Sequence, residues 1–356
     1  MKGGICMERD EMKGKIATVL GFIEPEDLGF TLAHEHLVID FRAIFKELPT
    51  ASDRHLAMQP VMMQNLDWIK KHRFAVPDNL LLLDEQEAID ETVLYRNEGG
   101  ESIVEVSNRS FGRDPLSLAR ISRATGVRIV MGGGYYTSRS HDERLKRIGV
   151  DELVEEFVGE IRNGVDDTGI RPGVLGEIGC LWPLADSERK ILIAAGKTQS
   201  MTGIAINIHP GWSERAPMEI IEILVAAGAD PEHIIISHTD RTLISHESRV
   251  EALKTGCYLV YDSIGREGYF DLETIVDIPN DNYRVNDIMR LMDAGYSDKI
   301  LLSVDVCTKD MRVKYGGHGY VHIPKYFVPL MRRKGMSQEA IDKLLIHNPA
   351  RSLAFF

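Results

Sequence analysis

Short apolar runs alternate with longer amphipathic stretches along most of the chain. The apolar runs are rich in β-branched residues and lack alternating polar positions, which is typical of strands buried on both faces. The stretches between them repeat apolar positions at helical spacing, and several begin with Ser or Asp and end with Gly, as helices do. The runs that we interpret as strands are residues 31–39, 102–107, 128–134, 173–179, 204–209, 234–238, 258–264 and 300–306.

This alternation predicts an α/β fold. Strands that are buried on both faces and separated by helices form parallel sheets, because a parallel return needs a crossover. A strand followed by a helix, repeated eight times, predicts a single (β/α)8 TIM barrel. The alternative is an open, doubly wound sheet with a dinucleotide site. It is disfavoured because no G-x-G-x-x-G follows the first strand, and the glycines at 132–134 lack the helix start that such a site requires.

Two segments depart from the bare repeat. Residues 14–29 alternate apolar positions and end in turn-forming residues, which predicts an N-terminal β-hairpin before the barrel. Residues 41–100 are far longer than one helix and contain helical patterns around 54–72 and 84–98. We interpret them as a helical insertion after the first barrel strand, either a cap or an oligomer surface. A last helix is expected within 335–352, and the domain prediction is a tail, 1–13, followed by one hydrolase barrel domain, 14–356.

Composition and charge narrow the classes of partner. The 356 residues suit one large barrel, and the net charge of −12 with no long basic run argues against nucleic acid and anionic membrane surfaces. No apolar run reaches the length of a membrane span, and the first residues lack a signal-peptide pattern, so a cytoplasmic protein is expected. Four cysteines are too few for a disulfide scaffold and are expected to be reduced.

Polar residues of metal-binding type lie inside the apolar runs or at their carboxyl ends. In the first run, His34 and His36 share one face, because alternate residues of a strand point to the same side. The carboxyl ends of barrel strands meet at the end of the barrel where barrel enzymes keep their active sites. Later runs place four more such residues there: Glu177, His209, His238 and Asp305.

A metal centre explains these six residues better than unrelated buried polar groups would. Each isolated imidazole or carboxylate costs several kcal/mol to bury, roughly, whereas a shared metal pair offsets the cost of all of them. Four His and two carboxylates without a thiolate favour Zn²⁺, with Mn²⁺, Co²⁺ or Fe²⁺ tolerated. One catalytic zinc uses three or four protein ligands, so six predict two divalent ions, roughly 3.5–4 Å apart.

The motifs resemble those of the amidohydrolase superfamily and specifically of its phosphotriesterase family, over nearly the whole chain from about residue 14. The resemblance is closest to the phosphotriesterase-related (resiniferatoxin-binding-like) branch, through LGFTLAHEH, GVLGEIGC, SHTDRT and KYGGHGY. It implies that His34, His36 and Asp305 hold a more buried α metal, and that His209 and His238 hold a more exposed β metal.

The resemblance also implies a bridging ligand and a mechanism. Glu177 stands where the phosphotriesterases proper have a carbamylated lysine, as in other glutamate-bridged members of the family. Two metals lower the pKa of a bridging water, so that a hydroxide attacks the substrate. Asp305 is expected to accept the proton and pass it to the leaving group, while the β metal stabilises the developing oxyanion.

Family membership leaves the substrate open, because the family includes hydrolases of phosphotriesters, lactones and N-acetyltaurine-type acylated amines. Arg215, Arg241 and Arg266 follow strand ends and favour an anionic substrate group, although each could instead pair with a neighbouring acid. Aromatic residues of the same loops, Tyr135, Tyr136, Trp182 and Trp212, could wall a pocket or seal the barrel top. His318 lies in a glycine-rich loop and could contact substrate or stabilise that loop.

We therefore predict a metal-dependent hydrolase that cleaves a small anionic amide, ester or lactone, with an N-acyl amine slightly favoured. The alternatives are a lactonase or promiscuous phosphotriesterase and, outside the enzymes, a ligand-binding protein with a vestigial metal site. The intact set of six ligands argues against the binding protein, because binding alone needs no Asp305 proton shuttle. The expected partners are a small-molecule substrate and, by analogy with the family, a second copy in a homodimer.

Overall fold

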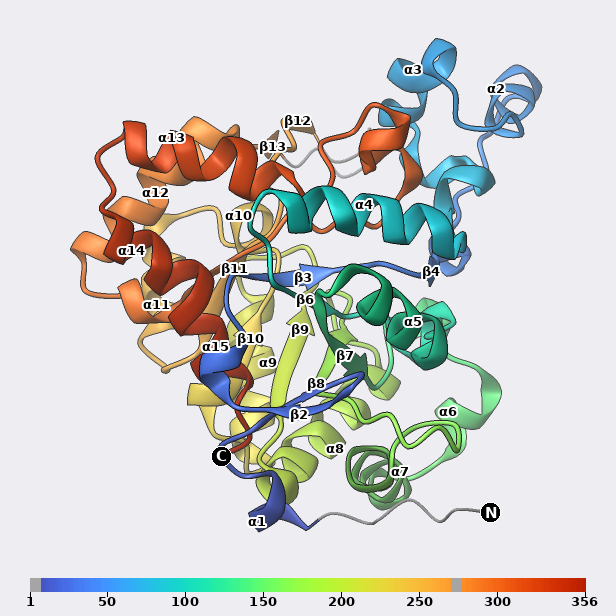
Figure 1. Ribbon diagram of the computed structural model, residues 1–356. Helices are drawn as coiled ribbons and strands as arrows, with labels where there is room; N and C mark the ends of the chain where they lie inside the picture. Colours follow the sequence, from blue (N-terminus) through green and yellow to red (C-terminus); the bar gives the residue numbers. More distant parts are fainter. Residues whose placement is uncertain (1–7, 270–276) are drawn as a thin grey trace.

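The computed structural model describes residues 8–269 and 277–356 of the chain. Its main sheet has eight strands, and all strands that are neighbours in it pair in parallel (Figure 1). Each strand lies within one of the predicted runs, and the strands follow one another in sequence order, so the barrel prediction is confirmed. A doubly wound sheet would reverse its order at a switch point. The strands are β3 (Thr31–Glu35), β6 (Ser102–Glu105), β7 (Arg128–Gly133), β8 (Val174–Gly179), β9 (Ala205–His209), β10 (Ile234–Ile236), β11 (Tyr258–Tyr261) and β14 (Ile300–Leu302).

Helices cover the outside of the barrel (Figure 1). Helix α5 shows why they form where they do: the Asp114 side chain caps its first turn, Pro115 occupies a position that needs no N–H donor, and Gly126 ends it with a φ of 70°. In the described part of the chain, none of the helices has the length and apolar content needed to cross a bilayer. The longer helices are α4 (Glu85–Asn97), α5 (Pro115–Thr125), α7 (Val150–Asn163), α8 (Asp186–Thr202), α9 (Ala216–Ala226), α11 (His246–Leu253) and α12 (Asp281–Asp293).

The short elements complete the connections and the two ends of the chain. The expected last helix is present but divided, because its middle, Lys343–His347, is a π-helical turn. Pro349 follows this turn and has no N–H to donate to the preceding turn, which interrupts the regular hydrogen bonding. The short helices and strands are α1 (Arg9–Met12), α6 (Glu143–Arg147), α10 (Thr239–Thr242), α13 (Val328–Arg333), α14 (Gln338–Asp342), α15 (Asn348–Leu353), β12 (Gly268–Tyr269) and β13 (Asp277–Ile278).

Two apolar clusters cover the two faces of the strands. Neighbouring residues of one strand fall into different clusters: Ile103 and Ile129 pack in the larger, and Val104 and Val130 in the smaller. Because successive side chains of a strand point to opposite faces, this division shows that both faces are buried, as the apolar runs predict.

The predicted hairpin closes the amino-terminal end of the barrel. Strands β1 (Ile16–Thr18) and β2 (Gly21–Ile23) pair antiparallel within the expected residues 14–29. Ile16 and Leu28 are fully buried in the smaller cluster, together with strand residues. The hairpin therefore completes the core at the end of the barrel opposite to the predicted metal site.

The insertion leaves and rejoins the barrel at one place. Strand β4 (Ile39–Asp40) pairs antiparallel with β5 (Leu81–Leu82), so the two ends of residues 41–80 lie side by side. Between them, α2 (Ala51–Ala57) and α3 (Leu66–Lys71) stand out beyond the barrel (upper right in Figure 1). The second helical pattern, 84–98, is α4, which is the barrel's own crossover helix rather than part of the protrusion.

Ion pairs hold the insertion against the loop that follows β14. The guanidinium of Arg73 donates to both carboxylate oxygens of Asp310, at 3.1 and 2.8 Å for Oδ2 and 3.2 Å for Oδ1. Asn79 Nδ2 donates to the same carboxylate at 3.0 Å, and Lys309 Nζ lies 2.6 Å from Asp78 Oδ1. The Asp310 side chain is fully buried, so these bonds replace its lost hydration. We call this group the Asp310 latch.

Candidate metal and substrate site

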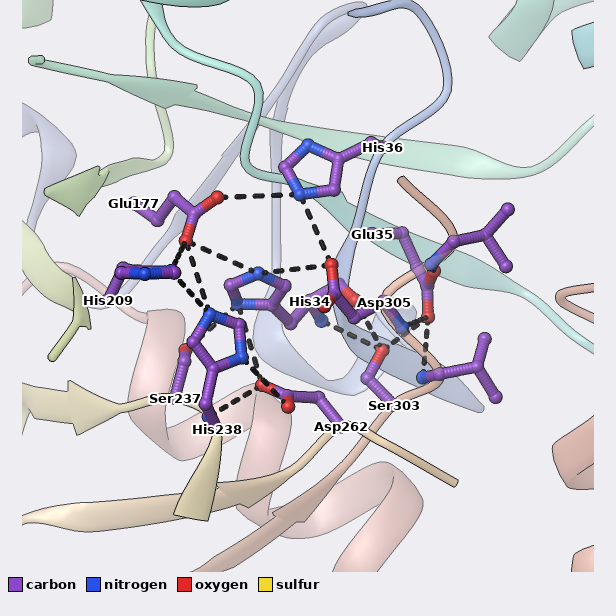
Figure 2. Close-up of polar contacts among 12 residues, drawn as sticks. His34, Glu35, His36, Glu177, His209, Ser237, His238, Asp262, Ser303 and Asp305 are labelled. Carbon is purple, nitrogen blue, oxygen red and sulfur yellow. Dashed lines mark hydrogen bonds and ion pairs between the residues drawn. The ribbon is translucent and has the colours of Figure 1, made fainter. Parts of the chain in front are cut away.

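The barrel brings the six predicted ligands together. They come from the carboxyl ends of five strands that are distant in the sequence, and Figure 2 shows their side chains directed at a common centre. His34 has no exposed side-chain area, and His209 is the most exposed of the six, at 12%. The set is His34, His36, Glu177, His209, His238 and Asp305.

The ring nitrogens and carboxylate oxygens fall into two groups. His34 Nε2 and His36 Nε2 lie 3.8 and 3.4 Å from Asp305 Oδ1. In the second group, Nδ1 of His209 lies 2.6 Å from Nε2 of His238.

Glu177 reaches both groups, and its Oε2 also lies 3.7 Å from His34 Nε2. Its Oε1 is 3.4 Å from His36 Nε2, and its Oε2 is 3.1 Å from His209 Nδ1 and 3.5 Å from His238 Nε2. A carboxylate in this position can serve two metal ions at once.

Hydrogen bonds fix which ring nitrogen faces the centre. His34 Nδ1 lies 2.8 Å from Ser237 Oγ, which in turn donates to Asn207 Oδ1 at 3.0 Å. Because Ser237 donates its only hydroxyl proton to Asn207, its oxygen accepts a hydrogen bond from His34 Nδ1–H. The free lone pair of the ring is then on His34 Nε2. His238 Nδ1 donates to Asp262 Oδ1 at 2.9 Å, with the same consequence. Such partners orient metal-binding imidazoles in many proteins.

The buried polar atoms of the cluster suit a metal. His34 Nε2 is buried and has no hydrogen-bond partner within the described residues, which is costly for an imidazole unless an ion occupies the centre. Burial lowers the pKa of His34, and it lowers the pKa of His209 to about 4, helped by the neighbouring His238. Both rings are therefore neutral at physiological pH, as metal ligands must be.

The carboxylates of the cluster are ionised. Burial alone would raise the pKa of Glu177, but His34 and the other imidazoles hold it well below its usual value. Burial likewise opposes ionisation of Asp305, but Arg266 and the imidazoles together outweigh it, so the pKa of Asp305 is also well below normal. The same two carboxylates raise the pKa of His36 to about 10 against the effect of burial. A divalent metal would take the place of that proton.

Two of the six residues have unusual backbone conformations. His238 and Asp305 have φ values of 59° and 50°, and the described part of the chain has only two other non-glycine residues with positive φ. This left-handed conformation costs about 1–3 kcal/mol and persists where surrounding structure holds it, often at functional sites. Both residues lie just beyond the ends of their strands.

All of the six residues except His34 line a cavity of about 150 Å³, and we call the six its floor. Its walls come from the insertion and from loops at the ends of the strands. The lining includes three apolar side chains of the insertion, Phe41, Ile44 and Phe74, which we call the apolar wall, and three cationic side chains, Lys46, Arg139 and Arg241, which we call the cationic wall. Cavities for drug-sized ligands are typically about 300–1,000 Å³, so this one suits a small molecule.

Of the predicted substrate contacts, Arg241 lines the cavity. Its guanidinium carbon lies 4.9 Å from the centre of the Trp212 ring, and its Nη2 is 3.9 Å from Asp305 Oδ2. Arg266 does not line the cavity but donates to Asp305 Oδ2 at 2.8 Å, so it pairs with a carboxylate of the cluster. The structure thus separates two arginines that look alike in the sequence.

The other predicted contacts do not line the cavity. Tyr135 turns away and donates to Glu156, while its neighbour Tyr136 faces inward, because adjacent residues at a strand end point to opposite sides. Of the two tryptophans, Trp182 is 36% exposed and does not line the cavity, whereas Trp212 does. Arg215 is exposed at the start of α9, and His318 lines a separate hollow beside Arg266.

Sequence reasoning missed residues that support the site. Ser107 Oγ lies 2.9 Å from His36 Nδ1, and Asp262 holds His238. The signal for both was present, because each is a polar residue at the end of a predicted strand. Tyr136, expected only as a possible wall residue, lies 3.2 Å from both ring nitrogens of His209, and burial raises its pKa well above 10, so its hydroxyl stays protonated.

A sequence profile of the phosphotriesterase family matches residues 14–353, which is nearly all of the chain. The chain belongs to the phosphotriesterase family. It is 42% identical over 346 residues to the N-acetyltaurine hydrolase of Xenopus tropicalis, and this alignment covers 97% of this chain and 99% of the relative. As a member of this family, the chain is an enzyme, a metal-dependent hydrolase of small molecules.

Solved structures of phosphotriesterase-like proteins share the fold. A resiniferatoxin-binding protein from Rhodobacter sphaeroides superposes with a TM-score of 0.92 and 35% identity, covering 99% of this chain and 97% of that one. A lactonase from Listeria monocytogenes gives a TM-score of 0.76 at 26% identity, covering 96% and 99%. The family and the fold predicted from the sequence are therefore both confirmed.

Proposed function

We propose that the protein hydrolyses a small N-acyl amine that carries an anionic group, of the N-acetyltaurine type. The observation that carries the proposal is the cationic wall, which lines the same cavity as the clustered residues and includes Arg241, 3.9 Å from Asp305. Relatives named N-acetyltaurine hydrolase match over almost their whole length, which supports the same choice. The small cavity leaves room for a compact substrate only.

His34, His36 and Asp305 would hold one metal ion, and His209 and His238 the other, with Glu177 shared between them. The proposed ions are two Zn²⁺, because the donors are imidazoles and carboxylates, and Mn²⁺, Co²⁺ or Fe²⁺ would fit the same donors. When bound, such ions activate water near neutral pH and polarise a carbonyl group.

Asp305 is the proposed proton carrier. Its carboxylate is ionised, faces the centre of the cluster and is held at Oδ2 by Arg266. It can accept the proton of the attacking water and deliver it to the amine nitrogen. The C–O bond forms first, and the C–N bond of the amide then breaks as the nitrogen takes up this proton, so the products are a carboxylic acid and an amine that keeps the anionic group.

The cavity walls would orient the substrate. A sulfonate or carboxylate group suits the guanidinium groups of Arg241 and Arg139, because arginine donates to such anions in pairs. The acyl group would contact Phe41, Ile44 and Phe74, which also exclude water from the centre.

We further propose that the enzyme is a cytoplasmic homodimer, with its catalytic domain starting at residue 14 after a short tail. Cys180, Cys257 and Cys307 are free and buried, which suits a reducing compartment. The insertion exposes large apolar side chains that a second subunit could cover: Phe45, Leu56, Met58, Met62 and Met63.

A lactone is the second candidate substrate. The lactonase from Listeria monocytogenes shares the fold, and the apolar wall of the cavity would accept a lactone ring. The cationic wall distinguishes the two candidates, because a neutral lactone gains nothing from Arg139 and Arg241.

The test combines metal content with turnover. The protein is purified without added metal, and its metals are counted while N-acetyltaurine, N-acetyl amino acids, a γ-lactone and a phosphotriester are offered as substrates. About two metals per chain, with chelator-sensitive cleavage of the anionic N-acyl amines fastest, is expected. Fastest cleavage of the lactone would select the second candidate, and no cleavage with two metals restored would overturn both.

A further inference from the structure

Glu35 lies between the two histidines of β3, but its side chain does not join the metal cluster. Figure 2 shows it directed toward the segment that carries Ser303 and Asp305, away from the common centre. It is fully buried, and the proposed hydrolysis uses it neither as a metal ligand nor as a proton carrier. A buried carboxylate is costly unless its oxygens are satisfied, so its contacts indicate its purpose.

The carboxylate of Glu35 binds four consecutive residues after β14. Its Oε1 accepts hydrogen bonds from Ser303 Oγ at 2.5 Å, Val304 N at 2.8 Å and Asp305 N at 3.3 Å. Its Oε2 accepts from Val306 N at 2.9 Å. All four partners are donors, and three are backbone groups that would otherwise be buried without a partner.

These bonds lie between β3 and β14, the first and last strands of the barrel. In the described residues the ladder of paired strands runs from β3 round to β14, and no backbone pairing joins those two strands to each other. Ser303 closes part of the gap, because its Oγ accepts from His34 N at 3.0 Å. Glu35 closes the rest, so a side chain does here what a backbone ladder does elsewhere in the sheet.

The segment held in this way contains the strained residue of the site. Asp305 has a φ of 50°, a conformation that must be imposed by its surroundings in a residue other than glycine. We propose that Glu35 is a positioning residue, which fixes the backbone of residues 303–306 so that the Asp305 carboxylate faces the metal centre. The inference rests on the proposed role of Asp305 in metal binding and proton transfer.

A double-mutant cycle tests whether Glu35 acts through Asp305. Glu35→Gln keeps the size of the side chain but turns an acceptor oxygen into a donor facing an N–H group. The cycle compares wild type, Glu35→Gln, Asp305→Asn and the double variant in competition with a chelator, with thermal unfolding and kcat as further measurements. We expect Glu35→Gln to weaken retention of the metals about 10- to 100-fold, as for other groups that orient metal ligands, and to lower kcat with little change in KM. In the Asp305→Asn background, Glu35→Gln should weaken retention of the metals less than about twofold.

Glu105 provides the matched control. It is also a fully buried carboxylate on a barrel strand and accepts from the N–H groups of Leu37 and Ser107, but it has no hydrogen bond to residues 303–306. Glu105→Gln should therefore have the same effect with and without Asp305→Asn. If Glu35→Gln fails to fold, Glu35→Asp, which keeps the charge but shortens the side chain by one carbon, enters the same cycle.

The two possible failures are distinguishable. Equal losses of metal retention from Glu35→Gln in both backgrounds would show that Glu35 only closes the barrel, and would overturn the inference. Full turnover and full metal retention by Asp305→Asn alone would instead overturn the proposed function.

Discussion

The floor and the walls of the cavity are built in different ways. The floor consists of side chains at the ends of barrel strands, and several of its imidazoles are held by hydrogen bonds to a second layer of residues, as Ser237 and Asp262 hold His34 and His238. The walls come from the insertion and from loops, which reach the cavity by irregular paths and are held by contacts such as the Asp310 latch. The floor would thus set the reaction, and the walls would set which molecule reacts.

The largest expected effect belongs to the floor. Asp305→Asn should lower kcat about 10³-fold, because the amide cannot carry the proton, and a group of this kind contributes about 10²–10⁴-fold. Steady-state kinetics on the substrate chosen by the panel measures it. Asp298→Asn, near the amino-terminal end of β14, is the control and should leave kcat unchanged. Equal activity of both variants would mean that the floor does not perform the reaction.

The next effect belongs to the cationic wall. Arg241→Met should raise KM for an anionic N-acyl amine about 10- to 100-fold, because a charge-assisted hydrogen bond contributes about 1.5–3 kcal/mol. For a neutral N-acyl amine of the same size, KM should hardly change. If KM rises equally for both substrates, Arg241 acts on the shape of the cavity and not on charge.

The Asp310 latch should make the stability of the protein depend on pH. Arg73 holds the pKa of Asp310 at about 2 against the effect of burial, whereas the unfolded chain has an ordinary aspartate. Ionised Asp310 therefore adds about 2 kcal/mol to the free energy of unfolding above pH 4, and this stabilisation is lost as the pH falls through 2. Urea unfolding of metal-free protein should show Asp310→Asn less stable than wild type at pH 5 and nearly equal to it at pH 2. A difference that persists at the lower pH would contradict the assignment.

The smallest effect concerns the apolar wall. Phe74→Leu removes part of a ring that lines the cavity, so longer acyl chains should gain about tenfold in kcat/KM relative to acetyl, since a methylene in a pocket is worth about 1–3 kcal/mol. A series of N-acyl chains of increasing length measures this preference. An unchanged preference would place the acyl group elsewhere in the cavity.

The same division explains what the sequence reveals. The clustering of the six floor residues was predictable, because a strand has a fixed period and barrel strands end together, so His34 and His36 imply a shared face. The walls were not, because no period governs a loop. Tyr135 and Tyr136 differ by one position, yet only Tyr136 lines the cavity. Only folded coordinates separate such neighbours.

Charge pairing was equally hidden in the sequence. Arg241 and Arg266 both follow strand ends, but Arg266 binds Asp305 and Arg241 lines the cavity. The acid nearest in the chain proved to be a poor guide, because Arg266 pairs with a residue 39 positions away, beyond the end of the neighbouring strand. The role of Glu35 was hidden in the same way, since its partners lie about 270 positions further along.

The short pairing of β4 with β5 has an evolutionary consequence. Because it brings residues 39–40 and 81–82 together, everything between them enters and leaves the barrel through one narrow neck. A segment of different length or sequence could replace residues 41–80 without moving β3 or α4. New preferences could then arise by exchanging one contiguous stretch of a gene, while the inherited chemistry at the bottom of the cavity stays untouched.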